Sequence, residues 1–390
     1  MPKRKTADAK FEELTQHLDI ERLRKSIRDG FSDFPDPRRT KSIDYPAWYL
    51  ILVILCGYLA GGNTISDIAH FAELKKHWLD ELTGISRVPS YDTIWWFLVR
   101  TDPNAFKTLI IKWLKSIPHE LQDQLLVIDG KRLRGISTSE HITHLVELFA
   151  SESRLTLAQE KVPNKAGERI ALPALLDTVD VQGAIVSMDA LYAHVTDIQE
   201  VLQRGADYIV GIKGNQGHLE AEVENFFRQA NDVNFEGIKM TQEQSQDKGH
   251  GRKEQRRVTV IHDLDWLPQK DKWKLQSLIE VRSERLLKGV KEQSVRYYGS
   301  SRKTSANNFS KWIREHWSIE NSLHYVLDVI FDEDASKSDI GNSAENISLI
   351  RRFAMNIVRS IDPDRGMANA RRCAAYEPRY LSGLLGKVFC

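Results

Sequence analysis

Residues 125–131 read L-L-V-I-D-G-K, and this stretch decides the class of fold. A short apolar run that ends in an acid and a glycine is typical of a strand buried on both faces of a sheet. Upstream of it, apolar residues recur at helical spacing through residues 10–120. We therefore predict an α/β domain from residue 121 onward, preceded by an all-helical domain over residues 1–120.

The same strand pattern recurs twice downstream. Residues 183–189, G-A-I-V-S-M-D, form a second apolar run ending in aspartate, and residues 207–214, D-Y-I-V-G-I-K-G, form a third. Residues 194–205 and 218–229 read as helices. This alternation predicts a mixed, partly parallel sheet flanked by helices.

Two further regions are expected to add strands. Residues 143–151 and 155–162 read as two strands joined by a turn. Residues 231–302 break the strand–helix rhythm with β-rich runs around the polar stretch 242–257, so we predict a β-rich insertion with a polar loop in it. The α/β domain is expected to end near residue 370, leaving residues 371–390 as a weakly patterned tail.

The longest apolar run, residues 48–60, has 13 residues and is too short to span a bilayer, which takes roughly 18 or more. It predicts a buried helix, and we expect no membrane partner. Two short helices follow, at residues 64–78 and from Ser90 onward. Such a pair is either a DNA-reading helix-turn-helix or, more commonly, a packing unit.

Composition bounds the classes of partner. The 390 residues include 55 basic and 54 acidic ones, so a surface that binds nucleic acid must be local rather than global. Cys56, Cys373 and Cys390 lack the paired spacing of a zinc site or a disulfide framework. A reducing, cytoplasmic setting is expected.

Residues 312–334, W-I-R-E-H-W-S-I-E-N-S-L-H-Y-V-L-D-V-I-F-D-E-D, carry an acid within a helical stripe expected to face inward. Glu320 lies in the middle of that stripe, and an ionised carboxylate away from water needs a partner. One interpretation is a hydrogen bond to His316 or His324, one turn away on either side. The other is a bound cation. The stripe consists of Ile313, His316, Glu320, Leu323, His324, Leu327 and Phe331.

Three acids share one kind of setting. Asp129 and Asp189 each end an apolar strand, where open α/β sheets place their chemistry, and Glu320 lies on the helical stripe. Taken singly, a strand-ending aspartate is most often a turn residue or a helix cap. Taken together, three oxygen ligands suit Mg²⁺ or Mn²⁺, and two such ions would serve a nuclease or a strand transferase.

At these residues the sequence resembles the insertion-sequence transposases of the H-repeat-associated group, whose DDE catalytic domain has a ribonuclease H-like fold. The resemblance covers nearly the whole chain, in six pieces that follow the family's order. They lie at residues 127–135 (V-I-D-G-K-R-L-R-G), 184–191 (A-I-V-S-M-D-A-L), 205–216 (G-A-D-Y-I-V-G-I-K-G-N-Q), 247–254 (D-K-G-H-G-R-K-E), 316–324 (H-W-S-I-E-N-S-L-H) and 327–334 (L-D-V-I-F-D-E-D).

The resemblance implies a fold and an activity. Asp129, Asp189 and Glu320 match the family's catalytic, metal-binding acids, and Mg²⁺ or Mn²⁺, as two ions, is the implied cofactor. The implied reaction is metal-dependent cleavage and strand transfer of double-stranded DNA at the terminal inverted repeats and the target. A homodimer on DNA, in the cytoplasm and on the nucleoid when bound, is also implied.

The sequence departs from related transposases near two of the acids. His316 and Leu327 stand where relatives often have arginine and lysine, Tyr325 replaces a usual tryptophan, and residues 191–194 read L-Y-A-H. Two alternatives to an active transposase therefore stay open. One is a DNA-binding protein of the same fold without catalysis, and the other is a general Mg²⁺ nuclease.

Further residues are candidates for DNA contact or support. Each has a plain alternative as a solvated turn or a solvated charge run. Asp328 is a reserve candidate if Glu320 is not the third acid. The DNA-contact candidates are Lys131, Arg132, Arg134, Lys213, Asn215, Gln216, His250, Arg252 and Arg256. The supporting candidates, which would orient the acids or the metal, are His316, Asn321 and His324.

Overall fold

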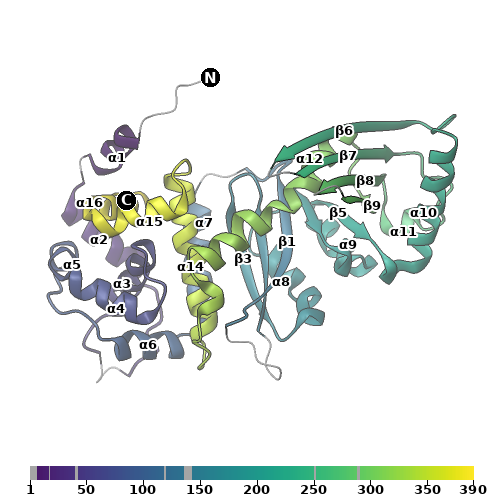
Figure 1. The fold of residues 1–390 in the computed structure, drawn as a ribbon. Helices are drawn as coiled ribbons and strands as arrows, with labels where there is room; N and C mark the ends of the chain where they lie inside the picture. Colours follow the sequence, from purple (N-terminus) through teal and green to yellow (C-terminus); the bar gives the residue numbers. More distant parts are fainter. Residues whose placement is uncertain are drawn as a thin grey trace.

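The computed structural model describes residues 7–16, 18–39, 43–117, 120–135, 143–249, 252–287 and 290–390. A helical body lies at one end of the molecule, a mixed sheet covered by helices lies in the middle, and the sheet continues into an extension at the far end (Figure 1). The mixed sheet with flanking helices, a β-rich insertion and an N-terminal helical region confirms the fold class expected from the sequence.

The sheet has nine strands in the order β3-β2-β1-β4-β5-β9-β8-β7-β6. Strands β1, β4 and β5 are parallel to one another, whereas β2, β3 and β9 join antiparallel. The strands are β1 (Leu125–Arg132), β2 (His144–Ala150), β3 (Leu155–Val162), β4 (Ile185–Met188), β5 (Asp207–Ile212), β6 (Met240–Gly249), β7 (Arg252–Ile261), β8 (Ser277–Leu287) and β9 (Val290–Ser300).

The parallel centre of the sheet is its most apolar part, as the unbroken apolar runs predict. Leu126, Val127 and Ile128 in β1 are fully buried. Ile128 pairs with Met188 in the parallel register of β1 and β4. The next residue in each case is an aspartate, so Asp129 and Asp189 lie side by side where the pairing of β1 with β4 ends. Asp189 directly follows β4, but Asp129 does not end its strand as expected, because β1 continues to Arg132 through its pairing with β2.

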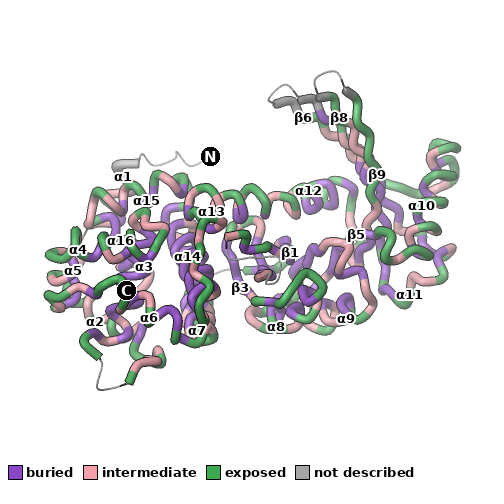
Figure 2. The backbone as a smooth tube through the Cα atoms, turned by 60° about the horizontal axis from the view of Figure 1, so that its bottom comes forward, coloured by how far each residue is buried: buried purple, intermediate pink, exposed green. Residues whose placement is uncertain are grey.

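The insertion consists of the four antiparallel strands β6 to β9, and β9 joins it to β5 of the central sheet. Its far part rises from the rest of the molecule as an arm (Figure 2). The polar stretch 242–257, expected to be a loop, instead belongs mostly to strands β6 and β7, which pair from Met240 opposite Ile261 to Gly249 opposite Arg252. A strand with polar side chains on both faces has no hydrophobic alternation, so hydrophobic patterning cannot reveal it.

Helices pack on the sheet and build the N-terminal body. Asp19, Thr64, Ser90 and Asp102 cap the starts of four of them through side-chain acceptors. The helices are α1 (Ala7–Thr15), α2 (Ile20–Gly30), α3 (Ala47–Leu59), α4 (Ile65–Leu74), α5 (Lys76–Thr83), α6 (Tyr91–Arg100), α7 (Pro103–Ser116), η2 (Lys165–Ala171), α8 (Leu172–Leu176), η3 (Ala190–Tyr192), α9 (Val195–Gln203), η4 (Gly214–Gln216), α10 (Gly217–Asp232), α11 (Lys270–Trp273), α12 (Ala306–His316), η5 (Glu320–His324), α13 (Tyr325–Val329), η6 (Glu333–Ala335), α14 (Ser343–Ile361), α15 (Met367–Tyr376) and α16 (Pro378–Phe389).

Helix α3 is the apolar run expected to be a buried helix, and twelve of its residues are buried in the body. Among the described residues, no helix combines the length and the apolar character that crossing a membrane requires.

Helix α14 ties the helical body to the sheet. Its Asn346 side chain donates to the carbonyl oxygens of Leu98 and Thr101 at the end of α6. Further along the same helix, the Asn356 side chain accepts from the backbone N–H of Thr156 in β3 and donates to the carbonyl oxygen of Thr156. Both asparagines are fully buried, so these hydrogen bonds fix the helix against both parts.

The last residues complete the N-terminal body. Residues 371–390, expected as a weakly patterned tail, instead lie in helices α15 and α16, which pack against α1, α2 and α3. Figures 1 and 2 place α15 and α16 among the N-terminal helices. Tyr380, Leu381, Leu384 and Leu385 are buried there.

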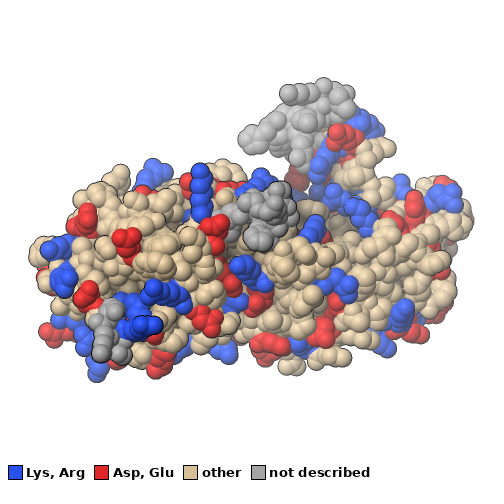
Figure 3. All heavy atoms as spheres, turned by 90° about the horizontal axis from the view of Figure 1, so that it is seen from below, with Lys and Arg blue, Asp and Glu red and all other residues tan. Residues whose placement is uncertain are grey.

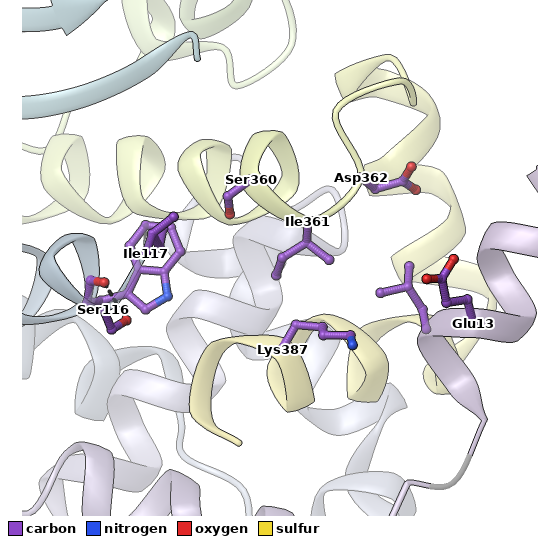
Figure 4. Close-up of a pocket in the computed structure, with 9 residues that line it drawn as sticks. Glu13, Ser116, Ile117, Ser360, Ile361, Asp362 and Lys387 are labelled. Carbon is purple, nitrogen blue, oxygen red and sulfur yellow. Dashed lines mark hydrogen bonds between the residues drawn. The ribbon is translucent and has the colours of Figure 1, made fainter. Parts of the chain in front are cut away.

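A cavity of about 380 Å³ lies at this seam between the two ends of the chain. Figure 4 shows Lys387 of α16 below Ile361 and Asp362, with Glu13 of α1 across from them. Its lining is mixed polar and apolar and includes none of the three candidate acids. It is therefore a separate feature from the site described next.

Candidate active site

Two of the three candidate acids meet at the ends of the parallel strands. The Asp129 side chain is partly exposed at 26% and accepts from the N–H of Gly130 through Oδ1. The Asp189 side chain caps η3, accepting from the N–H of Leu191 at 2.7 Å. The cap interpretation of Asp189 therefore holds for one carboxylate oxygen, while its other oxygen is left for another partner.

The third acid comes from the helix expected to carry it. Carboxylate oxygens of Asp129 and Glu320 and a ring nitrogen of His324 all lie within 4.8 Å of one another. The Nδ1 atom of His324 is 3.4 Å from Glu320 Oε2 and 4.0 Å from Asp129 Oδ2. Strand and helix thus bring a carboxylate pair and a histidine to one point.

The helix is not regular at this point. Residues Glu320–His324 form a π turn between α12 and α13, a form of helix that is rare and is found disproportionately at functional sites. Leu323 and Leu327 are fully buried, as the stripe predicts, but the Glu320 side chain is 57% exposed. The expectation that Glu320 faces the core was wrong, because it lies at the rim of the site, where it accepts a hydrogen bond from His324.

A buried chain of charged groups lies beneath the cluster. Glu147 stands opposite Asp129 in the β1–β2 register and is fully buried. It lies 3.2 Å from His324 Nε2 and forms a short ion pair with Arg352 of α14. Arg352 is also bonded to Glu333 at 2.6 Å, and the Nζ atom of Lys131 lies 3.1 Å from Glu333.

These contacts set the protonation of the cluster. Burial raises the pKa of Asp129 to about 6, with added repulsion from Glu320 and Asp189, although His324 and the N–H of Gly130 oppose the rise. Burial alone would lower the pKa of His324, but its hydrogen bonds to Glu147 and Glu320 raise it to about 9. At neutral pH a charged imidazole therefore sits beside the acids, in the position where a cation would compensate them.

Sequence reasoning missed two acids near this cluster. Glu147 left a trace, because it interrupts an otherwise apolar strand, H-L-V-E-L-F-A. Glu168 in η2 left none. Its carboxylate is buried beside Gly130, and burial, with repulsion from Asp189 and Asp129, raises its pKa to about 7.

The supporting candidates lie at different distances from the acids. His316 is hydrogen-bonded to Ser187 in β4 at 3.0 Å, and burial lowers its pKa to about 4, so it is a neutral packing and bonding group beside Asp189. Asn321 is exposed on the π turn. Of the two histidines considered as partners for Glu320, the structure selects His324.

The basic residues that follow Asp129 divide into two kinds. The Lys131 side chain is 6% exposed and is held by Asp328 and Glu333, so it belongs to the buried charge chain rather than to a DNA-facing surface. Asp328, the reserve candidate for the third acid, forms its ion pair with Lys131. Arg132 is exposed, and Arg134 is 80% exposed with its Nε atom 3.8 Å from Asp334.

The K-G-N-Q turn stands next to Asp189. Asn215 donates to the carbonyl oxygen of Ala190 at 2.6 Å, and Gln216 donates to that of Ala193. The two amides therefore hold the loop that follows Asp189, a role that sequence reasoning did not assign. Lys213 is exposed and lines a cavity of about 650 Å³ together with Asp189, Arg228 and Arg296.

Candidates in the insertion lie on the β6–β7 hairpin. Arg256 pairs with Glu254 at 2.9 Å, and Arg252 starts strand β7. His250 lies outside the described residues. Figure 3 shows Lys and Arg side chains at the base of the arm, and both signs of charge on the arm itself and over the rest of the face in view.

The residues of the cluster fit a divalent cation. Carboxylate oxygens of Asp129 and Glu320 lie within 4.8 Å of each other, so one ion could contact both. Asp189 is close enough for its charge to raise the pKa of Asp129. Such a set is destabilised by its own repulsion unless a cation or a proton is present. His324 offers a nitrogen ligand in addition, though its bonds to Glu147 and Glu320 favour the protonated form.

Comparison with known proteins gives the context of this site. The family described as "Transposase DDE domain" matches residues 120–357, and the family described as "DDE_Tnp_1-associated" matches residues 28–114. The chain is 31% identical to "Putative transposase YncI" of Escherichia coli O157:H7, covering 93% of this chain and 94% of that protein. It is 29% identical to "H repeat-associated putative transposase YhhI" of Escherichia coli strain K12, covering 93% and 98%.

Among solved structures, a piggyBac transposase synaptic complex with hairpin DNA aligns with 98% of this chain and 81% of that one, at 12% identity and a TM-score of 0.46.

Proposed function

The chain belongs to the transposase DDE domain family, and from that premise we propose that it cuts DNA at the ends of an insertion sequence and joins those ends to a target. The observation that supports the proposal most is that Asp129 and Asp189 follow paired residues of the parallel strands β1 and β4, while ligand atoms of Asp129 and Glu320 lie within 4.8 Å of each other. The proposed cofactor is Mg²⁺ or Mn²⁺, as two ions.

The proposed reaction has two phosphoryl transfers. In the first, a water oxygen attacks the scissile phosphorus, the P–O3′ bond breaks, and the end is left with a free 3′-hydroxyl. In the second, that hydroxyl attacks a target phosphorus and displaces a target 3′-oxygen. Divalent ions bound at the site would stabilise the charge on the phosphate and lower the pKa of the attacking group.

The protein's own residues prepare the site for this chemistry. Asp129 and Glu320 hold their carboxylates at one point, and Asp189 keeps a free oxygen because η3 uses only the other one. Asn215 and Gln216 fix the loop after Asp189, which keeps that oxygen in place. Preorganised charge of this kind supplies much of the catalysis in phosphoryl transfer.

The buried chain of charged groups beneath the site orients His324 and Glu320. Glu147 accepts from one ring nitrogen of His324, and the other ring nitrogen donates to Glu320. His324 therefore links the exposed Glu320 carboxylate to the fully buried Glu147 carboxylate. The arrangement resembles the outer-sphere hydrogen bonds that orient metal ligands in other proteins.

Isosteric substitutions test the assignment. Asp129→Asn, Asp189→Asn and Glu320→Gln should each abolish Mg²⁺-dependent cleavage and strand transfer of the element's terminal DNA while leaving the fold and DNA binding in place. The matched control is Asp339→Asn, an exposed acid that lies outside the cluster. Retention of cleavage by any one of the three acid variants contradicts the proposal.

The proposed partners are double-stranded DNA at the terminal inverted repeats and at the target, with two copies of the chain acting on one pair of ends. Inverted repeats flanking the reading frame, with short direct duplications outside them, are the expected genomic signature. Cutting of unrelated duplexes as fast as end duplexes would instead indicate a general nuclease.

A further inference from the structure

One face of the arm carries an ordered polar pattern that the chemistry of the acids does not use. The register of strands β6 to β9 aligns two rows of side chains on this face, because residues two apart on a strand point the same way. We call it the amide face. The row nearer the central sheet is Gln244, Arg257, Arg282 and Val295, and the outer row is Gln246, Gln255, Glu284 and Gln293.

The amide face is open to solvent and hollowed. The four glutamines are exposed, and the face lines a groove of about 700 Å³. At its base, Arg257 donates to Asn231 at 2.9 Å and Arg282 donates to Glu280 at 2.8 Å. These bonds hold the two guanidinium groups in place, and both arginines line the groove. A guanidinium group has five N–H donors, so these bonds do not use all of them.

The groove is continuous with the candidate active site. Arg282 and Val295 line both this groove and the cavity of about 650 Å³ that contains Asp189 and Lys213. A ligand that extends from Asp189 past Arg282 and Val295 would therefore reach the amide face. Further cations, Arg228 and Arg296, lie along that path.

Chemistry distinguishes the partner. The centre of a protein–protein interface is apolar and rich in aromatic residues, whereas the amide face offers Val295 as its apolar group within the two rows. Surfaces that bind DNA are polar and cationic. Glutamine side chains pair with both the donor and the acceptor edge of adenine, arginine pairs with guanine or phosphate, and an apolar group contacts the methyl of thymine.

We propose that the amide face reads base edges of the duplex that leads into the active site, and so selects the DNA end that is cut. The proposal rests on the proposed function for the identity of its ligand as DNA. Arg257 and Arg282 contribute affinity through phosphates or guanine, and Gln244, Gln255 and Gln293 contribute discrimination among sequences. Glu284 takes part in neither role, because Lys291 pairs with it at 2.8 Å and the Gln293 amide donates to it at 3.1 Å, which orients Gln293 on the face.

The test uses the full chain and a pool of random 30-base-pair duplexes in the presence of EDTA, so that no cutting occurs. The sequence enriched by the wild-type protein and a scrambled version of it then serve as the two probes. The triple variant Gln244→Ala, Gln255→Ala, Gln293→Ala should lower the ratio of the two affinities by at least about tenfold, since each good amide–base pair discriminates by about that much. Affinity for the scrambled probe should change little.

The matched control is Gln203→Ala, which removes an exposed glutamine at the end of α9, away from the arm. It should keep the wild-type ratio, and both proteins should unfold at the same temperature as the wild type. An unchanged ratio in the triple variant overturns the proposal, as does a wild-type protein that enriches no sequence. Altered sedimentation of the triple variant with an unchanged ratio would assign the face to a contact between copies of the chain, and also overturns it.

The outcome is separable from the proposed function. Sequence discrimination in EDTA does not need the acids, so Asp129→Asn should discriminate as the wild type does. Cleavage in Mg²⁺ tests the acids alone. A protein that discriminates but never cuts would refute the proposed function and leave the role of the amide face standing.

Discussion

Arg352→Met should destabilise the protein more than any surface substitution of an arginine. The Arg352 side chain is 3% exposed and joins two carboxylates, Glu147 and Glu333, which are also buried. Methionine keeps the aliphatic stem packed against its neighbours but removes the charge. Two buried carboxylates are then left without the cation that they share.

The magnitude follows from what remains. Breaking a buried pair by removal of one partner costs about 3–5 kcal/mol, because the remaining charge is uncompensated. Here each acid keeps one other partner, His324 at 3.2 Å from Glu147 and Lys131 at 3.1 Å from Glu333. The expected loss is therefore near the lower limit, about 3 kcal/mol, rather than twice the cost of a single pair.

Urea unfolding followed by tryptophan fluorescence measures the loss. The control is Arg204→Met, which removes a partly exposed arginine from two surface acids, Asp177 and Glu200, and should cost less than about 1 kcal/mol. Adding Glu147→Gln to Arg352→Met should recover part of the loss, since one uncompensated carboxylate is then neutral. If Arg352→Met and Arg204→Met shift the urea midpoint equally, the buried chain does not stabilise the fold as argued.

Three further outcomes are expected. Burial alone would raise the pKa of Glu147, but Arg352 and His324 lower it to about 2. The contribution of Glu147 to stability is therefore complete above about pH 4.5 and is lost as the pH falls toward 2. In acid titrations followed by circular dichroism the wild type should lose more stability over that range than Glu147→Gln, and equal slopes would contradict this prediction. Mg²⁺ at ten times its dissociation constant should stabilise the wild type by about 1.4 kcal/mol in thermal unfolding and EDTA should reverse this, whereas Asp129→Asn should show no response, and a full response from that variant would exclude Asp129 as a ligand. Gly130→Ala places a methyl group 2.3 Å from the buried Glu168 Oε1 and should cost about 1–3 kcal/mol, while Gly217→Ala, with nothing within 4 Å, should be neutral, so equal unfolding midpoints for the two variants would contradict the packing described here.

The sequence was sufficient for the parts of the fold where hydrophobic pattern and chemistry coincide. Asp129 and Asp189 each follow a short, unbroken apolar run that is recognisable in the sequence, and the parallel pairing of the two strands follows from the strand–helix order. Helical spacing singled out Glu320 as a candidate, and its naming as the third acid came from its grouping with Asp129 and Asp189 and from the family resemblance. Its exposure was not predictable, because a π turn shifts side chains around the helix and leaves no mark in the periodicity.

The remaining errors have two physical origins, namely partners that are distant in sequence and strands whose side chains carry no hydrophobic alternation. Lys131 looks like a free cation beside an acid until Glu333, some two hundred residues later, is placed next to it. Strands β6 and β7 are held by backbone pairing that polar side chains do not reveal. Glu168 stands among ordinary residues and gains its setting only when η2 folds over Gly130.

The packing of α15 and α16 against α1, α2 and α3 also sets an order of events during synthesis. The apolar surface of α3 and its neighbours is available soon after the first hundred or so residues leave the ribosome, but the helices that cover part of it are made last. At about 5–20 residues per second, that interval is on the order of 15–50 s. The helical body of a nascent chain therefore stays incomplete while the α/β domain is translated, and a message cut short before α16 would leave the apolar surface that α16 covers exposed to solvent.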